Sequence, residues 1–218
     1  MEKLPLLKAA TELAFVAHKK QIRKGTGLPY FFHLSDVTSR AAHYLFDISE
    51  TDLGMSKDEF LAACMLHDYI EDQGGTYEGV NKKFGGNVAR VVLECSRASN
   101  HESNLQKFEF LQTFCDKSFA SVLLKLADRY CNVWDYLRTP TKKNYASKYA
   151  LQAYPVYKRL IDDHYHLTDI RGLVEWPNIM SDVHVLQAII NNVYNVDILN
   201  SGDQTALVKE LVIKNGKI

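Results

Sequence analysis

The stretch AACMLHDYIEDQGG, residues 62–75, places an imidazole and three carboxylates directly after an apolar run. If this segment is helical, the four side chains lie on one face, within an arc of about 140°. These side chains are His67, Asp68, Glu71 and Asp72. Imidazole nitrogen and carboxylate oxygen are good ligands for a divalent cation. We therefore predict that His67 and Asp68 bind a metal ion, and that the two later acids reach a water molecule beside it.

Without a cation, this arrangement is unfavourable. The pattern predicts one continuous helix over residues 57–72, ended by Gly74 and Gly75. Three carboxylates then lie near the negative end of the helix dipole, where a Lys would gain about 0.3–1 kcal/mol. They also repel one another at spacings of three and four residues. A solvated acidic helix end is the alternative interpretation, but it fits poorly because His-Asp adjoins an apolar run.

A second apolar run, SVLLKLADRYCN, also ends in an acid, Asp128. Lys125, Asp128 and Asn132 are spaced to lie along one face of a helix. Asp128 is therefore a further candidate metal ligand. The alternative is an ordinary surface ion pair between Lys125 and Asp128.

The segment RKGTGLPYFFH combines a basic turn with aromatic residues. Arg23 and Lys24 adjoin two glycines, which allow close backbone approach, and paired cations match phosphate oxygens. Tyr30 and His33 follow, and His33 is a candidate ligand. The alternatives are a solvated basic turn and a histidine buried in the core.

Composition excludes several classes of protein. The 218 residues include 26 Lys and Arg and 26 Asp and Glu, so the formal charge is zero and no broad basic surface for nucleic acid is expected. No segment has the roughly 20 apolar residues of a membrane span, and the N-terminus does not resemble a secretory signal. The four cysteines form no Cys-x-x-Cys pair, so we predict reduced, buried thiols and a cytoplasmic protein.

Hydrophobic periodicity predicts an all-helical bundle in the first part of the chain. The predicted helices cover residues 5–22, 34–46, 57–72, 76–85, 87–96, 102–115, 119–137 and 143–161. After residue 165 the pattern changes to a helical stretch followed by the β-capable segment TALVKELVIKNGKI. We therefore place a domain boundary near residue 165, with an α/β-capable extension over residues 166–218.

The order of these motifs resembles that of the HD-domain metal-dependent phosphohydrolases. More narrowly, it resembles the hydrolase domain of RelA/SpoT-type proteins and the small alarmone hydrolases. The similar segments are AFVAHKKQIRKGTGLPYFFHLSDV, AACMLHDYIED, TYEGVNKKFGGNVARVV and LLKLADRYCNVWDYL, within residues 5–160. The resemblance implies an all-α HD-domain bundle over residues 1–165, and it leaves the extension without a role.

The resemblance also implies a site and a reaction. One manganese ion would be held by His33, His67, Asp68 and Asp128, while Glu71 and Asp72 would orient or deprotonate the attacking water. The nucleotide would be bound by Arg23, Lys24, Tyr30, Asn132 and Tyr149. The implied enzyme is a 3′-pyrophosphohydrolase of the alarmones ppGpp and pppGpp, which releases pyrophosphate and GDP or GTP. Its partner is a small nucleotide rather than nucleic acid or membrane, and self-association is left open.

Three positions depart from the family pattern and keep alternatives open. Gln73 replaces a usual Thr, Tyr130-Cys131 a usual Leu-His, and Trp134-Asp135 stands where an Arg is usual. Because these positions adjoin the expected nucleotide pocket, the substrate is alternatively the adenosine analogue (p)ppApp or the 2′-phosphate of NADPH. A third interpretation is a non-catalytic nucleotide-binding module that uses the C-terminal extension as an interaction surface.

Overall fold

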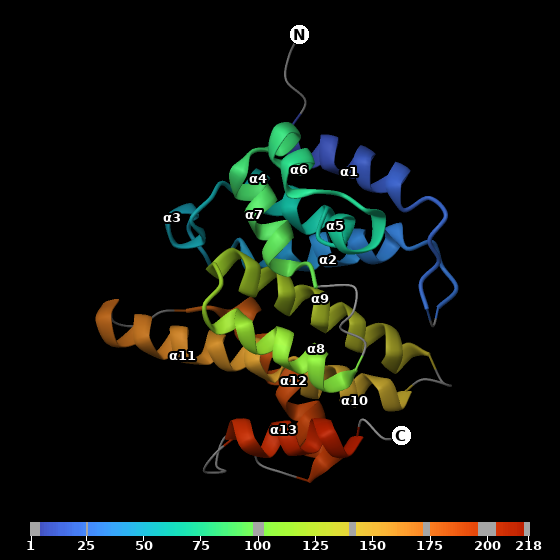
Figure 1. Cartoon of the computed structure of the whole chain (residues 1–218). Coiled ribbons are helices and arrows are strands. Elements are labelled where there is room, and N and C mark those ends of the chain that lie inside the picture. The colour runs from blue at the N-terminus through green and yellow to red at the C-terminus, as the bar shows by residue number, and fades with distance from the viewer. Residues whose placement is uncertain are drawn as a thin grey trace.

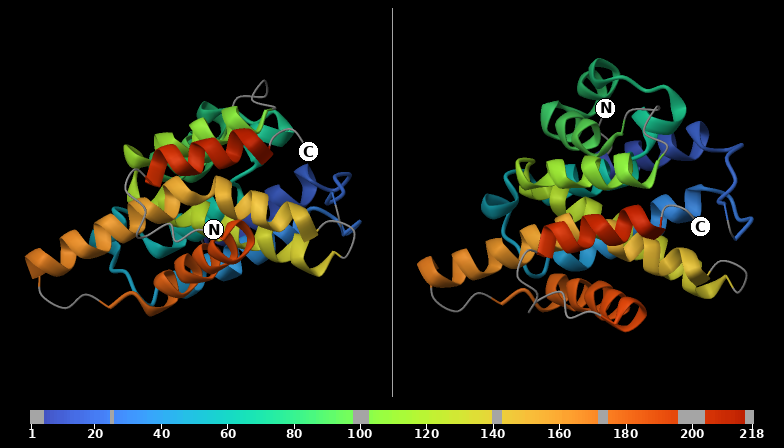
Figure 2. Two further views of the ribbon diagram at one scale, coloured as in Figure 1. Left: turned by 90° about the horizontal axis from the view of Figure 1, so that it is seen from below. Right: turned by 60° about the horizontal axis from the view of Figure 1, so that its bottom comes forward.

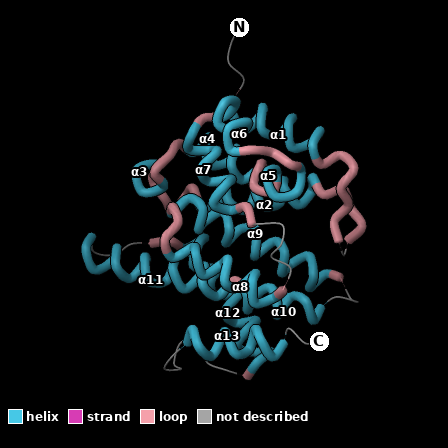
Figure 3. Tube along the Cα trace, viewed as in Figure 1, coloured by secondary structure: helices cyan, strands magenta, loops and turns pink. Residues whose placement is uncertain are grey.

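The computed structural model describes residues 5–24, 26–97, 103–139, 143–171, 175–195 and 204–215. Within these ranges the regular structure is helical, apart from one isolated antiparallel bridge between Ile22 and Pro29 (Figure 3). The predicted all-α class is confirmed. The elements are α1 Leu6–Ala17, α2 Phe31–Tyr44, α3 Glu50–Leu53, α4 Lys57–Met65, α5 Tyr69–Gln73, α6 Tyr77–Phe84, α7 Gly86–Cys95, α8 Asn104–Gln112, the 3-10 turn η1 Thr113–Cys115, α9 Phe119–Arg138, α10 Lys143–Gln152, α11 Tyr154–Arg171, α12 Pro177–Tyr194 and α13 Gln204–Asn215.

Helix α9 forms the centre of the bundle (Figure 1). It packs against α2, α7, α10, α11 and α12. Its residues from Ala120 to Arg129 are all buried, as expected of a helix that is covered on every side. Lys125 and Asp128 are therefore interior residues and not the exposed ion pair that the sequence left open.

Two acids from neighbouring segments satisfy the free N–H groups at helix N-termini. The carboxylate of Asp58 in α4 accepts hydrogen bonds from the backbone N–H of Leu6 and of Leu7, at 2.9 and 3.3 Å. Asp47, after α2, accepts from the backbone N–H of Asn178 and of Ile179, both at 2.9 Å. A carboxylate there satisfies orphan donors and complements the helix dipole. These contacts join α1 to α4 and α12 to α2.

The continuous helix predicted over residues 57–72 is wrong, because the chain breaks between α4 and α5. Leu66 and Asp68 both have φ −102° and ψ 5°, outside the helical region. The Nδ1 atom of His67 lies 2.8 Å from the carbonyl oxygen of Cys64, which in a continuous helix would accept from the N–H of residue 68. The imidazole thus supplies the shorter of two bonds to this carbonyl, the other coming from the backbone N–H of His67 at 3.4 Å.

The break also resolves the electrostatic conflict that the sequence raised. Glu71 and Asp72 lie in the first turn of α5, near the positive end of a helix, and not at the end of a long one. Gly74 ends α5 with φ +70°, a conformation that favours glycine. At Gly75 an added Cβ would lie 2.5 Å from the ring of Tyr69, so the chain can turn this closely only with glycine.

The C-terminal extension is helical in its described parts. The segment predicted to be β-capable forms α13, which packs against α8 and α10, because Val208 and Val212 are buried at helical spacing. Figure 2 shows α12 and α13 on different sides of α10. The boundary expected near residue 165 lies within α11, and the division into two domains stays a prediction.

The structure also tests the predicted end of the first helix, the state of the cysteines and the absence of a membrane span. α1 ends at Ala17 rather than at residue 22. The four cysteines are unpaired as expected, but only Cys64 and Cys95 are buried; Cys131 is half-buried and Cys115 is exposed. In the described part of the chain, no helix has both the length and the apolar character that a membrane span requires.

A buried polar cluster fixes α12 against α2. Asp182 is fully buried and accepts hydrogen bonds from the Arg40 guanidinium and, at 2.5 Å, from the hydroxyl of Tyr44. The Arg40 guanidinium also lies over the ring of Tyr130, 4.4 Å from its centroid. One carboxylate thus neutralises a cation and satisfies a buried hydroxyl.

We expect Asp182→Ala to lower the free energy of unfolding by about 3 kcal/mol, because Arg40 and the Tyr44 hydroxyl lose their shared partner. For a chain of this size, the unfolding midpoint should fall by roughly 6–12 °C in a thermal melt. The matched control is Asp162→Ala, which removes an exposed acid paired with Lys158 at 2.6 Å. That change should cost at most about 0.5 kcal/mol. Equal effects of the two substitutions would contradict the assignment.

Candidate functional site

Two histidines from different elements face each other in the interior. His33 lies in the first turn of α2 and His67 at the break between α4 and α5; both are buried, with ring centroids 5.5 Å apart. The bond from Nδ1 of His67 to the carbonyl of Cys64 assigns the proton to that nitrogen and leaves the Nε2 lone pair free. This tautomer is the one a metal ligand requires.

Two carboxylates complete the cluster. The Nε2 atom of His67 lies 2.9 Å from Oδ2 of Asp68 and 4.0 Å from Oδ1 of Asp128, while Nε2 of His33 lies 3.4 Å from that same Oδ1. Candidate ligand atoms of His33, His67 and Asp68 all lie within 4.8 Å of one another. The structure therefore brings together all four residues that the sequence indicated as ligands.

The protonation of the cluster depends on burial and on its own charges. Burial lowers the pKa of His33 and keeps the ring neutral. For His67, burial also lowers the pKa, but the Asp68 carboxylate outweighs it and the pKa is raised. For Asp128, burial raises the pKa, but the Lys125 ammonium and the His33 ring, 3.4 Å away, outweigh it, and the pKa is held well below its usual range.

Neighbouring side chains orient both carboxylates. The hydroxyl of Tyr30 donates to Asp68 at 2.6 Å. Asn132 donates from Nδ2 to Oδ1 of Asp128 at 2.5 Å, and Lys125 donates to Oδ2 at 3.2 Å. Such outer hydrogen bonds fix the direction of metal ligands.

The residues present fit a divalent cation. Both ring nitrogens of His33 and Nε2 of His67 are buried without a hydrogen-bond partner among the described residues. Buried polar atoms seldom lack a partner, because leaving one unsatisfied costs about 1–3 kcal/mol. A cation among two imidazoles and two carboxylates would supply the missing partner and balance the negative charge. The cluster can thus hold a divalent metal ion through a mixed nitrogen and oxygen ligand set.

The two acids of α5 lie beside this cluster with different partners. Glu71 accepts from both the backbone N–H and the Nη2 atom of Arg97, each at 2.8 Å, so both of its oxygens are engaged. Asp72 accepts from Nε2 of Gln21 at 2.7 Å through one oxygen. Burial and the nearby Asp68 carboxylate raise the pKa of Asp72, which favours its acceptance of a proton.

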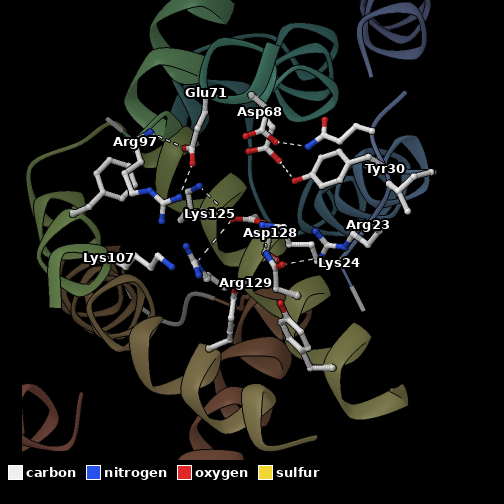
Figure 4. A pocket seen from close by; sticks show the side chains of 17 residues that line it. Arg23, Lys24, Tyr30, Asp68, Glu71, Arg97, Lys107, Lys125, Asp128 and Arg129 are labelled. Carbon is white, nitrogen blue, oxygen red and sulfur yellow. Dashed lines mark hydrogen bonds and ion pairs between the residues drawn. The ribbon is translucent and has the colours of Figure 1, made fainter. Parts of the chain in front are cut away.

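A cavity of about 370 Å³ opens beside the cluster (Figure 4). All of the expected nucleotide-binding residues line it, namely Arg23, Lys24, Tyr30, Asn132 and Tyr149. Asp68 at the break before α5, Glu71 of α5 and Asp128 of α9 point into it, as Figure 4 shows. Cationic, acidic and aromatic groups that are distant in the sequence therefore face one space.

The sequence interpretation missed several cationic and aromatic residues of the wall. Arg97, Lys107 and Arg129 extend into the cavity opposite Arg23, and Lys125 lies between them (Figure 4). Only Arg129 carried a signal, its position directly after Asp128; Arg97 and Lys107 lie in segments without a motif. Lys107 has no acidic partner among the described residues, and burial lowers its pKa. The wall also includes Gln21, Phe110 and Tyr136.

The chain matches a family model described as "HD domain" over residues 10–161, more than half of its length. It is 34% identical over 146 residues to a guanosine-3′,5′-bis(diphosphate) 3′-pyrophosphohydrolase of Aquifex aeolicus, covering 63% of this chain but only 19% of that protein. It is 32% identical over 142 residues to the mouse guanosine-3′,5′-bis(diphosphate) 3′-pyrophosphohydrolase MESH1, covering 64% of this chain and 74% of that protein. The chain thus spans about a fifth of the length of the longer bacterial relative.

The fold is also similar to that of a solved structure, reported as a metazoan ortholog of SpoT that hydrolyses ppGpp. The TM-score is 0.65, at 21% sequence identity, and the alignment covers 86% of this chain and 97% of the other. At this identity the likeness concerns the fold.

We expect Mn²⁺ to raise the unfolding midpoint of the wild-type protein and EDTA to reverse the rise. At 100 times its dissociation constant, a ligand of the native state adds about 2.7 kcal/mol of stability. For this length, that is roughly 5–11 °C in a thermal melt. Asp68→Ala and Asp128→Ala should abolish the rise, each variant being compared with its own metal-free melt. Glu78→Gln, an exposed acid on α6, is the control that keeps it. An undiminished shift in Asp128→Ala would contradict the ligand assignment.

Proposed function

Because this chain belongs to the HD-domain family, in the branch of the guanosine-3′,5′-bis(diphosphate) 3′-pyrophosphohydrolases, we propose that it is a manganese-dependent 3′-pyrophosphohydrolase of (p)ppGpp. The observation that carries the proposal is the joining of the His and Asp cluster to a cavity lined by six cationic side chains. These are Arg23, Lys24, Arg97, Lys107, Lys125 and Arg129. A substrate with several phosphate groups would balance their charge.

In the proposed reaction, water attacks the phosphorus next to the ribose and the bond from that phosphorus to the 3′ oxygen breaks. The products are pyrophosphate and a nucleotide with a free 3′ hydroxyl, GDP from ppGpp or GTP from pppGpp. His33, His67, Asp68 and Asp128 would hold a divalent ion, whose Lewis acidity would lower the pKa of water and withdraw charge from a phosphoryl oxygen. We assign the remaining steps to side chains around it.

Glu71 and Asp72 receive different parts in the proposed mechanism. Asp72 has one oxygen free of the bond to Gln21 and a raised pKa, so it is suited to take the proton of the attacking water. Glu71 is held at both oxygens by Arg97, which suits it to orienting that water. Arg23 and Lys24 hold the departing pyrophosphate and offset its developing charge.

A second candidate substrate keeps the same chemistry with adenine, as in (p)ppApp. The aromatic part of the wall accommodates either base, because Tyr136 and Tyr149 have ring centroids 4.8 Å apart and aromatic stacking does not distinguish adenine from guanine. The two side-chain amides of the wall, Gln21 and Asn132, are already bonded to protein groups. The NADPH 2′-phosphate interpretation and the cytoplasmic location stay predictions from the sequence.

We expect the protein with Mn²⁺ to convert ppGpp to GDP and pyrophosphate, because the cluster and the basic wall match that chemistry. A panel of ppGpp, pppGpp, ppApp and NADPH, with separate phosphate and pyrophosphate readouts, measures the preference. Release of phosphate from NADPH alone would identify a 2′-phosphatase. Tight binding of all nucleotides without turnover at any metal would instead support the non-catalytic module and contradict the proposal.

We expect Glu71→Gln and Asp72→Asn to lower kcat by about 10²–10⁴-fold, the contribution of a general base and its partner. Each variant should keep the Mn²⁺-dependent thermal shift, because neither residue is an assigned ligand. Glu78→Gln is the control for loss of one acid and should retain the wild-type rate. Loss of the thermal shift in Glu71→Gln would show that this residue binds the metal and that the division of roles is wrong.

A further inference from the structure

Arg23 is held to helix α9 by residues that follow it by more than a hundred positions. Its Nε atom donates to Oδ2 of Asp135 at 2.8 Å, and its Nη2 atom donates to Oδ1 of Asn132 at 2.7 Å. Within the described residues, the Nη1 group has no protein partner, and Arg23 lines the cavity. The guanidinium thus presents one edge to α9 and keeps donors for an anion.

The carboxylate that holds Arg23 lies outside the cavity. Asp135 is absent from its wall and instead lines a second cavity of about 370 Å³, formed by α2 and α9, together with Asp36 and Arg138. It therefore contacts Arg23 from behind and does not reach a ligand in the first cavity. Any effect of Asp135 on the reaction must pass through another residue.

The acids and amide on this face of α9 form a continuous series. Asp128, Asn132 and Asp135 follow one another at four and then three residues, so they lie along one side of the helix. Asn132 donates to Asp128 and accepts from Arg23, and Asp135 accepts from Arg23. The position of the guanidinium is therefore set relative to Asp128 by three hydrogen bonds.

The loop that carries Arg23 cannot by itself fix the position of the guanidinium. Its base is closed by the bonds from the N–H of Arg23 to the carbonyl of Leu28, at 2.8 Å, and from Tyr30 to Gln21, at 2.9 Å. A long side chain on such a loop has many rotamers, and ordering it costs up to about 2 kcal/mol. The ion pair with Asp135 selects one arrangement before the substrate arrives, and a pre-ordered group binds with a smaller entropy loss.

We propose that Asp135 is a positioning residue, which acts on the reaction through Arg23 by fixing the guanidinium for the pyrophosphate group. This inference rests on the proposed function for the identity of the anion, but the contacts themselves do not depend on it. Burial lowers the pKa of Arg23 while Tyr30 and Asp135 raise it, and the guanidinium stays charged in its largely buried place.

A double-mutant cycle separates this role from a merely structural one. We expect Asp135→Ala to lower kcat/KM by about 10–100-fold, the usual cost of a misplaced binding group. In the Arg23→Ala background, Asp135→Ala should alter kcat/KM by less than about threefold, because the side chain through which Asp135 acts on the reaction is absent. Asp135→Asn, which keeps an acceptor oxygen, should lie between Asp135→Ala and the wild type. An equal loss in both backgrounds, or no loss in the single variant, would overturn the proposal.

The matched control is Asp36→Asn, which removes a charge from the same second cavity without removing a hydrogen bond to Arg23, and it should keep the wild-type kcat/KM. The cycle is repeated with calorimetric binding of inorganic pyrophosphate, which needs no turnover. A wild type that binds pyrophosphate with a non-additive cycle but does not hydrolyse ppGpp would refute the proposed function and leave this inference standing. Hydrolysis of ppGpp together with an additive cycle would support the proposed function and refute the role of Asp135. Folding of each variant is checked by its Mn²⁺-dependent thermal shift.

Discussion

The structure is organised by the burial of ionisable groups around Asp128. A buried carboxylate is costly unless charges and hydrogen bonds compensate it, and here the compensation comes from Lys125 and Asn132, with the His33 ring of α2 3.4 Å away. These partners lie on α9 itself and on α2, so the packing of those two helices and the charge balance of the site are one constraint. A divalent cation held by the cluster would add the remaining positive charge. The helices around α9 therefore shield a site as well as bury apolar surface.

Pairing of an arginine with a carboxylate recurs at the cavity and between α2 and α12, with a different effect in each place. In the cavity beside the His and Asp cluster, the pairs Arg97–Glu71 and Arg23–Asp135 each place a cation at the wall and hold it with a carboxylate. In the core between α2 and α12, the Asp182 carboxylate instead binds Arg40 and Tyr44 and holds the two helices together. The difference lies in position: the first two arginines line the cavity beside the His and Asp cluster, while Arg40 lines the second cavity and its partner Asp182 is fully buried. A buried ion pair is thus structural or functional according to what its free donors face.

The break between α4 and α5 connects fold and chemistry most directly. It turns the chain so that Asp68 and the two acids of α5 reach the cavity. In one continuous helix over this segment, these side chains would point elsewhere. The residue that makes the break, His67, uses Nδ1 for the backbone and Nε2 for the cluster. A single side chain therefore ends a helix and offers a ligand atom with a fixed tautomer.

The sequence by itself determined the helical class and singled out His67, Asp68 and Asp128 as candidate ligands, because apolar periodicity and the step from apolar to acidic residues are local signals. The basic glycine turn indicated Arg23 and Lys24, whereas the full ligand set with His33 and the nucleotide contacts of Tyr30, Asn132 and Tyr149 came from a resemblance and not from geometry. The break after Met65, the helical form of α13 and the entry of Arg97 and Lys107 into the cavity were decided by tertiary structure. Those features depend on contacts between distant segments. A helix break needs a partner for its carbonyls, and β-capable residues become helical where buried valines meet α8 and α10. A cation outside any motif gains a role only from the cavity and the groups that it faces.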